Sequence, residues 1–190
     1  MSSDLAYRVT AEAPIRTIHV SSDPGSCVRL SFENDCDNDT LFDTFQNLVL
    51  PLNEESAICV RYALTELAAN AIRASRDRHV SDPVCLTIRS ESKRLCFELK
   101  DSAKGFDPAI LPYDLYGSED DIDLESEAFD AYRARCGMRR FGLGLIMARQ
   151  AVEDFRLSFL DTADQERAWT PDGMIKGTVV RFGMKMKENT

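Results

Sequence analysis

The sequence predicts an α+β fold: a two-layer sandwich in which a mixed, mainly antiparallel sheet carries helices on one face. Apolar residues recur at helical spacing over residues 41–52 and 60–76, and they alternate with polar residues over 83–90 and 94–100. A further helix signal after residue 142 precedes two more extended segments. This order of helices and paired strands favours a sheet that is covered on one side.

In the N-terminal part, the pattern of residues predicts extended chain followed by a helix. Residues 15–34 contain two alternating stretches, which the turn-rich residues 21–25 separate. The pattern leaves open whether both stretches belong to one sheet. The helix is expected to be capped by Asp39 or Thr40 and to end near Leu50, because the residue before a proline avoids helical geometry.

A second helix and a hairpin are expected next. The helix begins at Asn53, with Ser56 as an alternative cap, and continues through Arg76. The two alternating stretches that follow are expected to be strands joined by a turn at residues 91–93. Residues 101–105 then interrupt the alternation.

In the C-terminal half, the pattern of residues predicts shorter helices and strands that follow a long polar segment. A weak helical pattern covers residues 125–135, and an apolar helix opens at Gly142. Residues 155–160 and 176–186 are expected to be strands, separated by a polar loop over 161–173.

Negative charge is concentrated in one segment. Residues 106–131 contain nine of the 32 acids and no lysine or arginine, and the remaining 23 acids equal the 23 bases in number. Without a broad basic face, nucleic acid is not expected as a partner. No apolar run approaches the ~20 residues of a membrane helix, and the N-terminus shows no signal-peptide core, so we expect a cytoplasmic protein with no membrane contact.

Four short motifs combine chemically useful residues with glycines. They are Glu66-x-x-x-Asn70, Asp101-x-Ala103-x-Gly105, Gly142-x-Gly144 and Gly177-Thr178. Each one alone also has a structural interpretation, because polar groups on a helix face are usually solvated and glycines often only connect elements.

In this order and spacing, the motifs resemble those of the histidine-kinase-like, or Bergerat-fold, ATPases. Within that superfamily the chain is most similar to the small bacterial anti-sigma-factor serine/threonine kinases. The resemblance implies the sandwich fold described above, with ATP and Mg²⁺ as cofactors. It divides the chain into a partly extended N-terminal extension (1–27), an ATPase domain (28–186) and a tail (187–190), with an ATP lid at 106–141.

The resemblance also implies a role for each motif. Glu66 matches the general base, which deprotonates a serine hydroxyl or a water, and Asn70 matches the amide that holds Mg²⁺. Asp101 matches the acid that accepts a hydrogen bond from the adenine amino group, and Thr178 helps to hold the adenine. Gly105 lets the backbone turn beneath the nucleotide.

Further matching positions surround the phosphates. Arg73 matches a basic position that faces phosphate, and Gly142 and Gly144 present backbone N–H groups at a helix N-terminus. Arg139 or Arg140, at the end of the lid, is a candidate to clamp the γ-phosphate. The alternative interpretation is that these two arginines neutralise the acidic lid when no nucleotide is bound.

One position departs from the pattern. Ala103 stands where the family usually has its first glycine, and an alanine would be strained if the backbone there needs a positive φ. The acids of the lid have two interpretations, a docking surface for a basic partner or a solvated loop.

Three hypotheses for function follow. The first is an ATP-dependent protein serine/threonine kinase that phosphorylates a serine on a STAS-type anti-sigma antagonist and sequesters a sigma factor, so that transcription is regulated by partner switching. The second is a degenerate or non-catalytic ATP-binding module that controls a partner without phosphoryl transfer. The third is a detached catalytic domain that acts on a histidine-bearing partner. The resemblance implies a homodimer.

Overall fold

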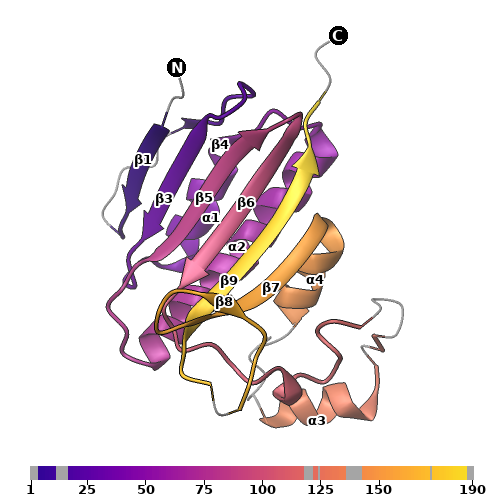
Figure 1. The fold of residues 1–190 in the computed structure, drawn as a ribbon. Helices are drawn as coiled ribbons and strands as arrows, with labels where there is room; N and C mark the ends of the chain where they lie inside the picture. Colours follow the sequence, from indigo (N-terminus) through magenta and orange to yellow (C-terminus); the bar gives the residue numbers. More distant parts are fainter. Residues whose placement is uncertain are drawn as a thin grey trace.

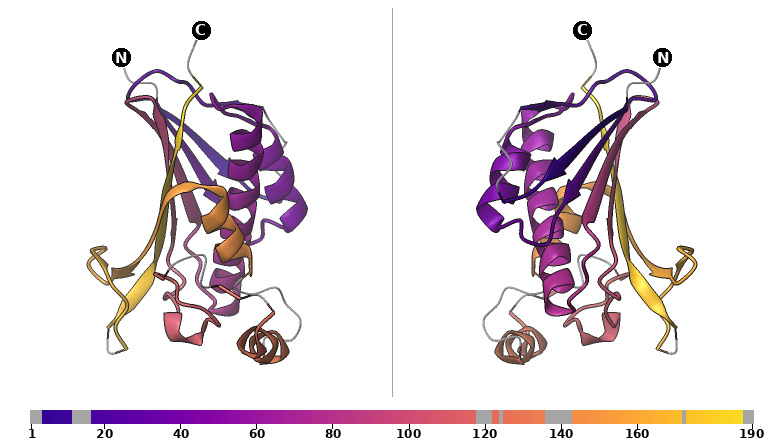
Figure 2. Two further views of the ribbon diagram at one scale, coloured as in Figure 1. Left: turned by 90° about the vertical axis from the view of Figure 1, so that its right-hand side faces the viewer. Right: turned by 90° about the vertical axis from the view of Figure 1, so that its left-hand side faces the viewer.

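Helices pack against one face of a seven-stranded sheet, and no helix of the described residues lies on the opposite face (Figures 1 and 2). The computed structural model describes residues 4–11, 17–117, 122–123, 125–135, 143–171 and 173–187. This arrangement confirms the predicted two-layer α+β sandwich. Of the helices within the described ranges, none combines the length and the apolarity needed to cross a bilayer.

The strands of the large sheet follow the order β1-β3-β5-β6-β9-β7-β8. They span Asp4–Val9 (β1), Cys27–Phe32 (β3), Val84–Glu91 (β5), Arg94–Asp101 (β6), Glu153–Asp161 (β7), Glu166–Arg167 (β8) and Ile175–Lys185 (β9). All neighbouring pairs are antiparallel except β1 and β3, which are parallel. The sheet is therefore mixed and mainly antiparallel, as predicted.

The helices divide into two groups. Those that pack on the sheet are Asn38–Gln46 (α1), Glu54–Asp77 (α2) and Leu143–Ala151 (α4). The helix Glu127–Arg135 (α3) lies beyond the end of the sheet (Figure 1). It continues the acidic segment, which from here on means residues 106–135 and which also contains the short 3-10 helix Pro108–Ile110.

The N-terminus contributes a strand that the sequence analysis did not identify. Strand β1 pairs along its whole length with β3, from Asp4 opposite Cys27 to Val9 opposite Phe32. Part of the expected N-terminal extension therefore continues the main sheet. Its exposed residues at the sheet edge explain why the alternation there is weak.

The first helix differs from its prediction at both ends. Its cap is Asp37, whose carboxylate accepts the Thr40 N–H at 2.8 Å, so the expected caps at Asp39 or Thr40 are wrong. It ends at Gln46 rather than near Leu50, because the next residues form β4 (Leu48–Val49), which pairs with β2 (Ile18–His19). The two extended stretches of the N-terminal part therefore lie in different sheets.

Helix α2 follows its prediction closely and is the longest element of the described chain. The Asn53 side chain accepts the Ser56 N–H at 2.8 Å, which confirms Asn53 as the cap. One face of the helix is buried, and its members include Val60, Leu64 and Leu67. Because residues one turn apart share a face, Glu66 and Asn70 lie together beside this stripe and are half-buried.

Strands β5 and β6 alternate between buried and less buried residues as expected, whereas β9 has runs of consecutive buried residues. Together with α2, these strands form the core. Phe97 of β6 and Phe182 of β9 stack with their ring centroids 4.7 Å apart, and both rings are buried. The hairpin between β5 and β6 turns at Ser92 and Lys93, which both have positive φ, as a two-residue hairpin turn requires. The predicted turn at residues 91–93 is confirmed, whereas the loop predicted over 161–173 contains the short strand β8.

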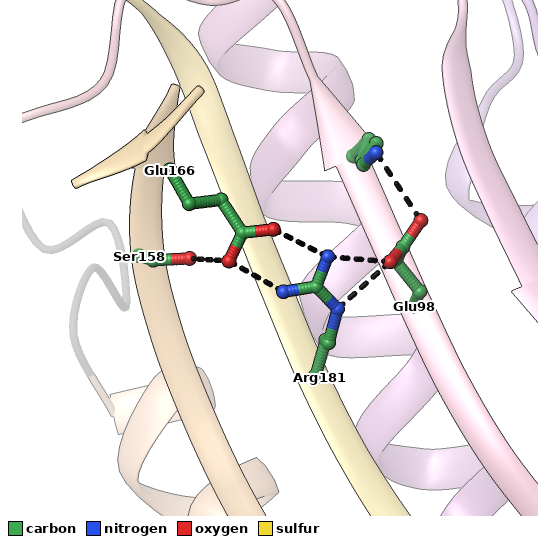
Figure 3. A network of polar contacts seen from close by, with 5 residues as sticks. Glu98, Ser158, Glu166 and Arg181 are labelled. Atoms are coloured by element: carbon green, nitrogen blue, oxygen red, sulfur yellow. Dashed lines mark hydrogen bonds and ion pairs between the residues drawn. The ribbon is translucent and has the colours of Figure 1, made fainter. Parts of the chain in front are cut away.

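A network of charged groups crosses the helix-free face of the sheet (Figure 3). Arg181 of β9 donates from Nε to Glu98 of β6 at 2.7 Å and from both terminal nitrogens to Glu166 of β8. Ser158 of β7 also donates to Glu166, at 2.8 Å. One guanidinium therefore links strands β6, β9 and β8.

The network shifts the titration of both acids. Hydrogen bonding to Arg181 lowers the pKa of Glu166 below its ordinary value. Burial alone would raise the pKa of Glu98, but hydrogen bonds from Arg181 and the nearby Lys100 outweigh it and lower that pKa as well. Both acids therefore stabilise the folded state in their charged form.

We expect Arg181→Leu to lower the free energy of unfolding by about 1 kcal/mol at pH 7, a typical value for a partly exposed ion-pair network. Because the folded-state pKa values of Glu98 and Glu166 are depressed, their contribution is full above the ordinary glutamate value of 4.5 and is lost as the pH falls through the lowered values. Urea unfolding from pH 7 to pH 3 should therefore show the difference between wild type and variant shrinking below pH 4.5.

Arg89→Leu is the matched control. Arg89 is an exposed arginine of β5 on the same face, and the described contacts give it no ion pair. A loss of stability as large in this variant would show that the network contributes nothing specific.

Candidate functional site

A cavity of about 260 Å³ lies where α2, the sheet, α4 and the acidic segment meet. Its walls are mainly apolar and include Leu67 of α2, Leu99 of β6 and Val180 of β9. Polar groups enter it at a few points only, among them Asn70 and Asp101. An apolar cavity with a few convergent polar groups is typical of a small-molecule site.

Asp101 is the buried acid of this cavity. The Thr178 hydroxyl donates to one carboxylate oxygen, and the Ala103 N–H donates to the other at 2.7 Å. Burial raises the pKa of Asp101 above its ordinary value, although these hydrogen bonds and the charge of Arg78 oppose the rise. Since a carboxylate oxygen has two lone pairs, Asp101 can still accept a hydrogen bond from a ligand donor.

The pairing of β6 with β9 brings Thr178 to Asp101. Asp101 of β6 and Thr178 of β9 lie opposite each other in the register, and Gly177 directly precedes Thr178 in the sequence. A Cβ atom on Gly177 would lie 1.8 Å from the Asp101 carbonyl oxygen, so the two backbones approach more closely than any side chain permits.

The turn at the end of β6, residues 101–105, shows whether the backbone at Ala103 has a positive φ. Positive φ angles occur at Lys104 (58°) and Gly105 (59°), and Ala103 is not among the residues with positive φ. The expectation that Ala103 is strained if it takes a positive φ therefore does not apply. Alanine fits this position because the left-handed backbone begins one residue later.

Glu66 and Asn70 of α2 lie at the side of the cavity that faces α4. Asn70 lines the cavity, and its amide oxygen accepts a long hydrogen bond of 3.4 Å from Arg73. Glu66 lies against the start of α4, because a Cβ atom on Gly144 would come within 2.3 Å of its Oε2. The fold therefore brings Glu66 of α2 against Gly144 of α4, two helices far apart in the sequence, while Asn70 and Arg73 lie on the following turns of α2.

Of the other predicted site residues, two line the cavity and three cannot be placed. Gly105 and Thr178 line the cavity together with Asp101. Arg139, Arg140 and Gly142 lie outside the described residues.

The described part of the acidic segment folds over the cavity. Ile110 and Tyr132 line the cavity, and Tyr113 stacks on Phe129 with ring centroids 5.9 Å apart. Arg149 of α4 donates to the carbonyl oxygens of residues 115 and 117, at 2.8 and 2.7 Å. The segment therefore has its own apolar contacts, whereas its acids at 123, 125, 127 and 130 are exposed.

Arg78 is a site residue that the sequence analysis missed. It lines the cavity, and its Nη1 donates to the carbonyl oxygens of Ala103 and Gly105. Its partners are backbone atoms of a turn that lies 25 residues and more along the chain. Such a contact leaves no pattern in side-chain types, so no sequence signal could have found it.

The residues present fit a nucleotide with a divalent cation. The buried Asp101 suits the amino group of a flat base between apolar walls, and the close approach at Gly144 leaves no room for a side chain beside Glu66. Asn70 offers the kind of oxygen that Mg²⁺ prefers. Within the described ranges, no group of three or more His, Cys, Asp or Glu side chains is arranged as a metal site.

Comparison with known families agrees with this geometry. Residues 40–167, more than half of the chain, match the family described as the histidine kinase-like ATPase domain. The matched range contains Glu66, Asn70, Asp101 and Gly144 and ends before Thr178. A search of curated proteins found no match.

We expect Gly177→Ala to destabilise the protein by several kcal/mol, because the new methyl group would collide with a backbone oxygen that cannot move without separating β6 from β9. Thermal unfolding monitored by circular dichroism measures the effect. Gly183→Ala on the same strand is the control, because the atoms nearest to its Cβ would be those at the flexible end of Arg94, from 2.9 Å. Equal losses in the two variants would contradict the role given to the contact at Gly177.

Proposed function

We propose, because the chain belongs to the histidine kinase-like ATPase family, that it is an ATP-dependent protein serine/threonine kinase of the anti-sigma-factor type. Its substrate would be a serine on a small STAS-type antagonist protein. Binding of a sigma factor when the antagonist is absent would then regulate transcription by partner switching. Family membership itself supports the coarser statement, that the chain is an ATP-binding domain.

One observation carries the proposal: a single cavity has the buried Asp101 carboxylate and the Asn70 amide on its wall, with the Glu66 carboxylate nearby. Asp101 and Asn70 both line the cavity, and Glu66 lies one helical turn from Asn70, about 6 Å along the helix axis. A nucleotide whose base meets Asp101 can therefore direct its phosphates toward Asn70 and Gly144. A hydroxyl brought to that end of the cavity would lie near Glu66.

The residues of this chain would act by positioning and by charge. When bound, Mg-ATP supplies the phosphoryl group and the cation that neutralises its charge. Asn70 would hold the metal, and the neighbouring Arg73 would add positive charge beside the phosphates. Glu66 would accept the proton of the serine hydroxyl as that oxygen bonds to the γ-phosphorus and the bond from this phosphorus to the leaving ADP breaks.

The two alternatives differ from the proposed kinase in the phosphoryl transfer: one transfers no phosphoryl group, and the other transfers it to a histidine. Two features favour the non-catalytic module, Ala103 and the long acidic lid. The backbone at Ala103 is not left-handed, which removes the first of them, and the lid still favours this alternative. A domain acting on a histidine-bearing partner would produce an acid-labile phosphate, whereas phosphoserine is stable in acid. The chemical stability of the product therefore separates the proposed kinase from this alternative.

Calorimetric titration with ATP and Mg²⁺ tests the binding site. We expect Asp101→Asn to weaken ATP binding at least tenfold, because a hydrogen bond to a charged group is lost, and we expect GTP to bind the wild type more weakly than ATP. Asp39→Asn, which changes an exposed acid of α1, should leave binding unchanged. Failure of the wild-type protein to bind millimolar ATP would refute the proposal.

We expect Glu66→Gln to slow phosphoryl transfer to an antagonist protein by a factor of about 10²–10⁴, the usual contribution of a general base, while ATP affinity stays within about threefold. Transfer is measured with labelled ATP, followed by acid treatment of the product. Glu55→Gln, at an exposed position in the first turn of the same helix, is the control. An equally active Glu66→Gln enzyme would remove the base assignment.

A further inference from the structure

Arg78 connects the end of α2 to the turn that carries Asp101. Its backbone caps the helix, with its N–H bonded to the carbonyl oxygens of Ala74 and Arg76. Its side chain reaches the 101–105 turn and donates to the carbonyl oxygens of Ala103 and Gly105. We propose that Arg78 is a positioning residue that holds this turn in its base-recognising shape and so sets the affinity and selectivity for the nucleobase. This inference rests on the proposed function.

The turn needs such support because its backbone is unfavourable. Lys104 and Gly105 follow each other with φ near +60°, and for lysine this left-handed conformation is costly. The two carbonyl groups that Arg78 binds belong to the residues on either side of Lys104. Both hydrogen bonds come from one nitrogen, Nη1, whose two hydrogens are fixed in the plane of the guanidinium and so hold the two carbonyl groups at a defined separation. The hydrogens of a lysine ammonium rotate freely and sit on a flexible stem, so they impose no such geometry.

The other hydrogen bonds of the turn connect it to the sheet, whereas Arg78 connects it to α2. Asp101 binds the Ala103 N–H within the turn, and the Lys104 N–H bonds to the Lys176 carbonyl oxygen at 2.8 Å. These bonds tie the turn to β6 and β9. Arg78 ties it to α2, the helix that carries Asn70 and Glu66. It therefore fixes the spacing between the base-recognising and phosphate-facing sides of the cavity.

Arg76 provides a closely matched control. It lies two residues earlier on the same helix and also donates to two backbone carbonyl oxygens, those of Asn34 and Cys36. Its partners belong to the connection between β3 and α1, and Arg76 does not line the cavity. Loss of Arg76 removes a comparable anchor without touching the 101–105 turn.

The test compares Arg78→Met with Arg76→Met by calorimetric titration with Mg²⁺ and ATP, GTP or inorganic tripolyphosphate. We expect Arg78→Met to bind ATP about tenfold more weakly and to discriminate less between ATP and GTP, as fits the loss of charge-assisted hydrogen bonds. Tripolyphosphate binding should change less than threefold. Arg78→Lys, which can restore only part of the contact, should be intermediate, and Arg76→Met should bind all three probes like the wild type.

Hydrogen exchange of the backbone amides at residues 103–105 adds a readout that needs no nucleotide. Exchange there should be faster in Arg78→Met and unchanged in Arg76→Met, while the thermal midpoints of the two variants stay similar. Equal losses of ATP and tripolyphosphate affinity, or an unchanged ATP affinity in Arg78→Met, would overturn the role of Arg78 while the proposed function stands. Absence of ATP binding by the wild type would overturn both.

Discussion

The close contact between the end of β6 and the start of β9 is the constraint on which the candidate site depends. Gly177 lies so near the Asp101 carbonyl that only a hydrogen fits between them. That approach sets the register that places the Thr178 hydroxyl on the Asp101 carboxylate. A buried acid is costly unless it is hydrogen-bonded, so the backbone contact and the polar contact stabilise each other's geometry.

Helix α2 contributes one wall of the candidate site and packs against the sheet. Its apolar stripe packs on the strands, which fixes the rotation of the helix and leaves Glu66 and Asn70 at its side toward α4. Gly144 at the start of α4 then allows the second helix to approach the Glu66 carboxylate. The stability of the core and the chemistry of the site therefore depend on the same helix orientation.

The acidic segment has two distinct faces. Its aromatic residues Tyr113, Phe129 and Tyr132 contact one another or the cavity, and Arg149 holds its backbone to α4. Its acids at 123, 125, 127 and 130 are exposed. Because Arg149 lies on the helix that begins beside Glu66, α4 contacts both the acidic segment and the Glu66 carboxylate.

Local signals in the sequence predicted most elements whose hydrogen bonds are local, although the equally local Asp37 cap of α1 was missed. The Asn53 cap bonds three residues ahead, the hairpin turns within two residues, and the spacing of Glu66 and Asn70 follows from one helical turn. The four motifs could also be located, because each consists of neighbouring residues. The sandwich itself followed from the periodicity of its strands and helices.

Tertiary contacts decided the rest. Helix α1 ends early because β4 pairs with β2, and the N-terminal segment becomes a strand because β3 offers it an edge. Ala103 is unstrained, and Arg78 reaches the turn beside it, only because α2, β6 and β9 meet there. Backbone groups distant in the sequence form these contacts, and a backbone group has the same chemistry whatever its side chain, so the pattern of residue types does not reveal them.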